Sequence, residues 1–85
     1  MASSMFFLAA QFDGRVLLTL EEACSVIGIA VQTGYNQMST GTFPLPHRKQ
    51  GKRVLIDVRD VAEYLDRERA AARKEFERRR AGDNA

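Results

Sequence analysis

Apolar and polar positions divide the chain into five stretches, of which the first has two apolar runs. In MFFLAAQFDGRVLLTL the two runs are separated by Asp13-Gly14. Asp-Gly is a preferred two-residue hairpin turn because both residues tolerate positive φ, so extended structure is favoured on either side. The apolar pattern of FFLAAQF is continuous rather than alternating, which leaves a short helix as the alternative. Apolar side chains that this chain does not cover are expected to cover a partner chain.

The second stretch, TLEEACSVIG, predicts a helix with a signal at each end. Thr19 and Glu22 have the spacing of a capping box, and Gly28 is suited to end the helix in the left-handed region. One apolar face at helical spacing contains Leu20, Ala23, Cys24 and Ile27. On this face Cys24 is interpreted as a small core residue rather than as a reactive thiol.

The third stretch, IAVQTGYNQMSTG, predicts a second short helix that ends at Gly41. Ile29, Val31, Tyr35 and Met38 are expected to form its inner face. Gly34 weakens a helix by up to ~1 kcal/mol relative to Ala, which indicates either a close approach or a helix ordered by binding. Two short helices joined by a glycine-containing turn are typical of a helix-turn-helix that presents its second helix outward, or of a helical hairpin without a DNA role.

The fourth stretch, TFPLPHRKQGKRVLIDV, predicts a small hairpin. Pro44 and Pro46 exclude a helix. Gln50-Gly51 separates two basic segments, so two short strands are expected to fold back with a cationic tip. A basic hairpin directly after a helix-turn-helix resembles a wing, which can lie along a phosphate backbone or in the minor groove. His47 is expected at the surface or near a phosphate.

The last stretch, DVRDVAEYLDRERAAARKEFERRR, predicts a helix of about 20 residues with Asp57 as its N-cap. An apolar stripe at helical spacing contains Val58, Val61, Leu65, Ala72 and Phe76. The helix is too long for the core that precedes it, so its second half is expected to project and to pack on another subunit or meet nucleic acid. The final AGDNA has no core-forming residues and is expected to fray.

Charge is distributed unevenly beneath a net charge of +2. Residues 1–46 have a net charge of −2 and residues 54–66 a net charge of −3. Residues 47–53 have four cations and no anion, and residues 67–80 have seven cations against three anions, which makes each of these blocks +4. Basic blocks on a small domain indicate a polyanionic partner or, as the plainer interpretation, a solvated surface.

Several classes of function are not expected. The only Cys and the only His exclude an internal disulfide and make a metal site improbable. We expect no cofactor and no enzymatic activity, because no acid–base pair, nucleophile–base pair or phosphate-cradling glycine loop is recognisable. No apolar run approaches the ~18 residues of a membrane helix, and no Lys or Arg precedes the first apolar run. A cytoplasmic protein is expected.

The segment LTLEEACSVIGIAVQTGYNQMSTGTFPLPHRKQGKRVLIDVRDVAEYL resembles the AlpA and excisionase-like winged-helix domains, relatives of the MerR DNA-binding fold. The resemblance rests on T-x-E-E-A, on G-x-F-P, and on D-V-x-x-Y-L after a basic hairpin, and covers about residues 17 to 65. The two ends, FFLAAQFDGRVLLTLEEAC and DVAEYLDRERAAARKE, resemble pyocin activator proteins, which are small activators of bacteriocin gene clusters derived from phage tails.

This resemblance implies an α+β, mainly α fold: a winged helix-turn-helix with a small β-hairpin wing and a long C-terminal helix. The expected organisation is an apolar N-terminal segment at 1–16 (a hairpin or self-association arm), a DNA-binding domain at 17–66, a basic helical extension at 67–80 and a disordered tail at 81–85.

Candidate DNA contacts fall into three groups. The second helix carries no cation, whereas related domains usually have Arg or Lys there. Gln and Asn can pair with adenine and the Thr methyl can touch thymine, so the base-reading candidates are Gln32, Thr33, Asn36 and Gln37. The phosphate-binding candidates are Arg48, Lys49, Lys52 and Arg53, with a secondary contribution from Arg73 and Lys74. Tyr35 is expected to pack in the core rather than to stack on a base.

We therefore expect a sequence-specific transcriptional regulator, an activator, encoded by a bacterium or a phage-derived mobile element. Its expected partners are double-stranded DNA and further copies of itself on repeated sites, with RNA polymerase as a possible protein partner. One alternative is an excisionase that bends attachment-site DNA for an integrase. Another is a protein-interaction adapter or antirepressor.

Overall fold

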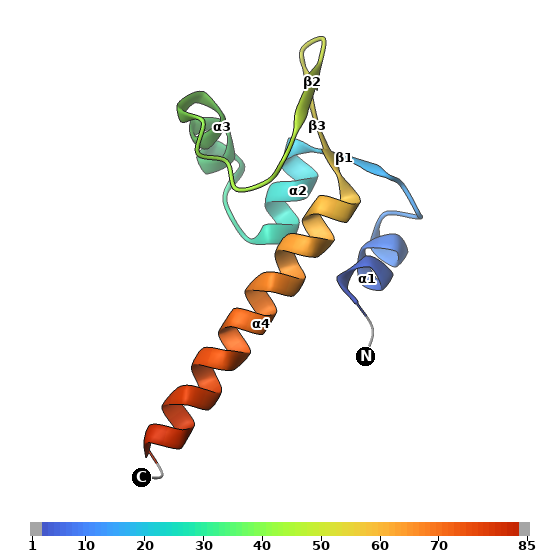
Figure 1. Ribbon diagram of the computed structural model, residues 1–85. Helices are drawn as coiled ribbons and strands as arrows, with labels where there is room; N and C mark the ends of the chain where they lie inside the picture. The colour runs from blue at the N-terminus through green and yellow to red at the C-terminus, as the bar shows by residue number, and fades with distance from the viewer. Residues whose placement is uncertain (1–2, 84–85) are drawn as a thin grey trace.

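The computed structural model of the protein describes residues 3–83. Its elements in chain order (Figure 1) are α1 Ser4–Gln11, β1 Leu17–Thr19, α2 Leu20–Ile27, α3 Val31–Thr40, β2 Arg48–Gln50, β3 Arg53–Asp57 and α4 Val58–Asp83. The fold is therefore α+β and mainly helical, with a β-hairpin and a long C-terminal helix, as the sequence predicts. In addition to the predicted hairpin, β1 pairs with β3, so the antiparallel sheet has three strands.

The apolar run before Asp13-Gly14 forms the helix α1, so the extended structure favoured there is wrong and the helical alternative is correct. The run after it contains β1 and is extended, as predicted. Asp13 and Gly14 do have positive φ, 54° and 75°, but they end α1 instead of joining two strands. The Gly14 N–H donates to the carbonyl of Ala9. Leu8, on the face of α1 that packs against the body, is 2% exposed, and α1 lies against α4. A continuous apolar run suits this contact because a helix needs only one buried face.

A small core forms where α2 and α4 pack against the inner face of the sheet. The strand order is β1-β3-β2, with Leu18 of β1 opposite Ile56 of β3. Both of these side chains are fully buried, as is Val61 of α4. The sheet thus holds the start of α4 against α2.

The predicted ends of α2 are confirmed. The Glu22 N–H donates to Thr19 Oγ1 (3.1 Å), and the Thr19 N–H donates to Glu22 Oε1 (2.9 Å), which completes the capping box. The bond from the Thr19 backbone is the main cause of the lowered pKa of Glu22, and an ion pair with Arg15 lowers this pKa further. Gly28 ends the helix with φ of 86°.

Helix α4 is longer than expected, with 26 residues instead of about 20. Residues 81–83 are helical, which corrects the predicted disordered tail in that part; residues 84–85 lie outside the described chain. Asp57 acts as N-cap, because its Oδ1 accepts the Arg59 N–H at 2.8 Å. The apolar stripe is buried only at the start of α4: Val58 is 4% exposed, whereas Phe76 is 61% exposed. The second half projects from the body, as predicted (Figure 1).

None of the helices between residues 3 and 83 combines the length and the apolar character that crossing a membrane requires.

Candidate nucleic-acid interface

Helix α3 is held against α2 at a point of close approach. Gly34 is the buried residue of α3, and it lies against the side chains of Cys24 and Leu20 of α2. This contact confirms the close approach that the glycine predicted. Because Gly34 and the half-buried Met38 point inward, the opposite side of α3 faces away from the body.

Three of the four predicted base-reading residues share this outer side. Gln32, Thr33 and Asn36 are exposed, and Gln32 Nε2 donates to Asn36 Oδ1 at 3.3 Å. Gln37 differs, because it is half-buried and its Oε1 is enclosed without a hydrogen-bond partner in the described part of the chain. The outer side of α3 therefore presents uncharged donors and acceptors, of the type that can pair with base edges.

Tyr35 is not in the core, which corrects the sequence prediction. Its side chain is 47% exposed, and its hydroxyl donates to Glu21 Oε1 of α2 at 3.1 Å. This hydrogen bond is the main cause of the raised pKa of Tyr35. Tyr35 follows the buried Gly34 by about 100° around the helix, so it lies at the edge of the inner face. Val31 was also predicted to lie on the inner face, but it is 39% exposed and does not lie there.

The predicted basic hairpin is present as β2 and β3. Gln50 pairs with Arg53, so the tight turn between the strands consists of Gly51 and Lys52. Residues opposite one another in the ladder point to the same side of the sheet. Arg48 and Arg53 therefore lie on the side away from the core, with Lys49 on the other side. All four predicted phosphate-binding side chains, Arg48, Lys49, Lys52 and Arg53, are exposed.

The hairpin tip and α3 share a groove. The groove has a volume of about 260 Å³, and its lining includes Tyr35 of α3 together with Lys52 and Arg53 of the hairpin. Arg48 lies elsewhere, in a separate hollow of about 410 Å³ beside Asp57. The structure therefore brings two of the four wing cations next to the candidate reading helix.

The secondary candidates Arg73 and Lys74 lie far from this groove. Both belong to the projecting half of α4, whereas α3 and the hairpin lie at the opposite end of the molecule (Figure 1). Lys74 is about 24 Å along the helix from Val58, at a rise of about 1.5 Å per residue. Arg73 Nε pairs with Glu77 Oε1 at 3.2 Å.

Three further features were considered from the sequence: a metal site, His47 and the Cys24 thiol. No group of three or more His, Cys, Asp or Glu side chains is placed to hold a metal ion there. His47 Nδ1 is 3.0 Å from the carbonyl oxygen of Leu45, and its ring lies edge-on to Phe43. Cys24 is 1% exposed, and burial, followed by the charge of Glu21, raises the pKa of its thiol. Cys24 is thus the core residue that the sequence predicted.

Two short helices that meet at a close contact, followed by a basic hairpin, define a winged helix-turn-helix protein. A family model described as a helix-turn-helix domain matches residues 17–69, and the chain belongs to this family. The family includes AlpA and excisionase-like DNA-binding proteins, and membership supports a DNA-binding regulatory role. Comparisons with curated proteins and with solved structures gave no significant match.

Proposed function

We propose that the protein is a sequence-specific transcriptional regulator that inserts α3 into the major groove of double-stranded DNA. The observation that carries this proposal is the groove in which the uncharged helix α3 adjoins Lys52 and Arg53. Neutral amide groups can read the edges of bases, whereas phosphates attract cations. A reading helix beside a cationic wing can therefore contact both the bases and the phosphates of one DNA site.

The roles of individual residues follow from where they lie. Gln32 and Asn36 present amide groups that can pair with adenine, and the methyl group of Thr33 can contact thymine. Gln37 contributes less, because its amide oxygen is enclosed. Lys52 and Arg53 bind the phosphates next to α3, and Arg48 and Lys49 extend the contact along the wing.

The proposed output is activation of transcription for a phage-derived or mobile element, in the bacterial cytoplasm where its DNA lies. The resemblance of both chain ends to pyocin activator proteins supports this output.

We further propose that copies of the protein associate through α1. Phe6 and Phe7 are 66% and 61% exposed, and their rings meet edge to face. Residues 3–12 carry no ionisable side chain, so two copies of this helix can meet without charge repulsion. Two projecting α4 segments, each with a net charge of +4 over residues 67–80, would repel each other. Association at α1 is therefore favoured over association along α4.

The experiment that tests the proposed function is footprinting on the DNA that surrounds the protein's own gene, with binding to random duplex measured in parallel. The proposal expects a protected site next to a promoter and weaker binding to random duplex. Protection confined to an attachment site beside an integrase gene would replace activation with an excisionase role. Binding to no duplex, even at low salt, would contradict DNA recognition and favour an adapter role.

A further inference from the structure

The projecting half of α4 is a second basic surface, which we call distal α4 and define as residues 67–80. Seven cations and three anions give it a net charge of +4. Its side chains are exposed, apart from the half-buried Glu75. The charge of this segment is therefore presented to solvent on a helix that stands away from the body (Figure 1).

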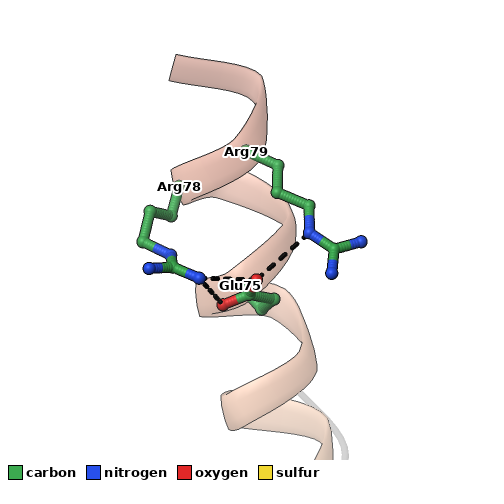
Figure 2. Close-up of polar contacts among 3 residues, drawn as sticks. All are labelled: Glu75, Arg78 and Arg79. Atoms are coloured by element: carbon green, nitrogen blue, oxygen red, sulfur yellow. Dashed lines mark hydrogen bonds and ion pairs between the residues drawn. The ribbon is translucent and has the colours of Figure 1, made fainter. Parts of the chain in front are cut away.

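The acidic side chains of distal α4 leave much of its positive charge uncompensated. Two arginines form ion pairs with the Glu75 carboxylate (Figure 2). Arg78 Nη2 lies 2.7 Å from both carboxylate oxygens, and Arg79 Nε lies 3.1 Å from Oε1. Within residues 3–83, Arg67, Lys74 and Arg80 form no ion pair. Exposed ion pairs contribute only about 0–1 kcal/mol, so Arg78 and Arg79 can also turn to another anion at little cost.

The cations are arranged along the helix. At about 100° per residue, Arg67, Lys74 and Arg78 fall on one stripe, with the small side chains of Ala70 and Ala71 beside it. From Arg67 to Arg78 the stripe extends about 16 Å. One DNA strand places a phosphate at about every 3.4 Å of axial rise, so this length corresponds to several phosphates. The stripe therefore suits an extended polyanion better than a small anion.

Distal α4 lies far from α3 and the wing. The molecule is 56 Å long, with the wing and α3 at one end and the last turns of α4 at the other (Figure 1). Lys74 is about 24 Å from the start of α4, whereas charges in physiological salt are screened over about 8 Å. These cations are therefore separated from α3 and the wing by more than this screening distance.

We propose that distal α4 binds a second segment of double-stranded DNA, so that one protein molecule joins two segments. This inference rests on the proposed function, because α3 and the wing must hold the first segment. Charge complementarity favours DNA over the other candidates for this surface. A second copy of distal α4 has the same positive charge, and an acidic protein partner would need apolar anchors, of which Phe76 is the only large one on distal α4.

The test is a capture assay in which a bead-bound duplex carrying the footprinted site retains a second, fluorescent duplex. Wild-type protein is expected to retain it. The variant R67Q/K74Q/R80Q removes three unpaired charges and keeps good helix formers, so capture should fall at least about tenfold. Its affinity for a single duplex, measured by anisotropy, should change less than twofold. The charge-conserving variant R67K/R80K should capture as well as wild type does.

Five results would overturn the inference while leaving the proposed function in place. The first is no capture by wild-type protein that still binds one duplex, and the second is undiminished capture by the triple variant. The third is a loss of single-duplex affinity in the triple variant as large as in K52Q/R53Q. The fourth is loss of capture in F6S/F7S, which would mean that paired copies, not distal α4, join the duplexes. Retention of polyglutamate in place of the second duplex would also overturn it, in favour of an acidic protein. Failure of wild-type protein to bind any single duplex would instead contradict the proposed function.

Discussion

Gly34 of α3 and Cys24 of α2 are so close that a methyl group at position 34 would lie 2.5 Å from the Cys24 sulfur. The next neighbours, Leu20 and Phe43, lie at ordinary contact distances of 3.6 and 3.8 Å. The contact between the helices is therefore set by a missing side chain on one helix and a small side chain on the other. The orientation of the candidate reading helix depends on this pair.

Gly34→Ala is expected to lower the free energy of unfolding by about 1–3 kcal/mol, because the added methyl overfills the contact. Ala is otherwise the better helix former by about 1 kcal/mol. When Cys24→Ala removes the sulfur first, Gly34→Ala should therefore be neutral or stabilising. Urea unfolding of the four proteins in this double-mutant cycle measures the coupling. Equal effects of Gly34→Ala in the two backgrounds would show that the sulfur does not limit the approach.

Signals contained in a few neighbouring residues predicted structure well. The capping box at Thr19 and Glu22, the helix end at Gly28 and the hairpin at Gln50 all depend on local geometry, and all are present. Positions decided by distant contacts were harder to predict. The N-terminal run is helical because it packs across α4, a partner more than forty residues away in sequence.

The candidate site shows the same limit. The uncharged outer side of α3 and the basic hairpin could be predicted from residue types, but their shared groove could not. Tyr35 was misplaced because tyrosine is intermediate in burial, so its residue type alone does not assign it to the core. The close approach predicted at Gly34 was the available signal, since the residue after an inward-facing glycine lies about 100° further around the helix.

Asp57 should make stability depend on pH. Two hydrogen bonds from the Arg59 side chain, at 2.6 and 2.9 Å, are the main reason that the pKa of Asp57 is lowered to about 2. A group whose pKa is lower in the folded state stabilises the fold above its unfolded pKa and loses this effect as the pH falls through the folded value. The stabilisation should thus be complete above about pH 5 and disappear between pH 4 and pH 2.

The measurement compares Asp57→Ala with the wild type by urea unfolding at several pH values. The variant should be about 1 kcal/mol less stable at pH 6, as expected for the loss of an N-cap, and the difference should narrow at pH 2.5. Asp57→Asn, which can still cap the helix but cannot ionise, separates capping from charge. A difference that stays constant between pH 6 and pH 2.5 would assign the effect to capping alone.

Lys52 and Arg53 should govern the salt dependence of DNA binding. Lys52→Ala and Arg53→Ala are each expected to weaken binding to all duplexes and to reduce the slope of log K against log salt by about one unit. Arg15→Ala is the matched control, because Arg15 is also exposed but pairs with Glu22, outside the groove. Anisotropy titrations at several salt concentrations measure the slopes. A slope that does not change in the wing variants would remove the wing from the contact.

Self-association should depend on α1 and not on α4. F6S/F7S is expected to shift the protein toward monomer in sedimentation experiments, because it removes an exposed apolar pair that we assign to the interface between copies. Phe76→Ser is a close control, since Phe76 and Phe7 are both 61% exposed and only Phe7 lies on α1. The interface would be refuted by wild-type protein that is monomeric both free and on DNA carrying several sites.

Asn36→Ala should relax sequence preference without a general loss of DNA affinity. Its amide lies on the exposed side of α3, where Gln32 donates to it, and losing one bidentate base contact costs about 1–3 kcal/mol on the specific site. Gln37→Ala should cost less, because the Gln37 oxygen is already enclosed. Ser25→Ala, an exposed change on α2, controls for surface substitution. Affinities for the footprinted site and for random duplex measure the difference. If Asn36→Ala weakens both equally, Asn36 does not read a base and contributes only to general binding.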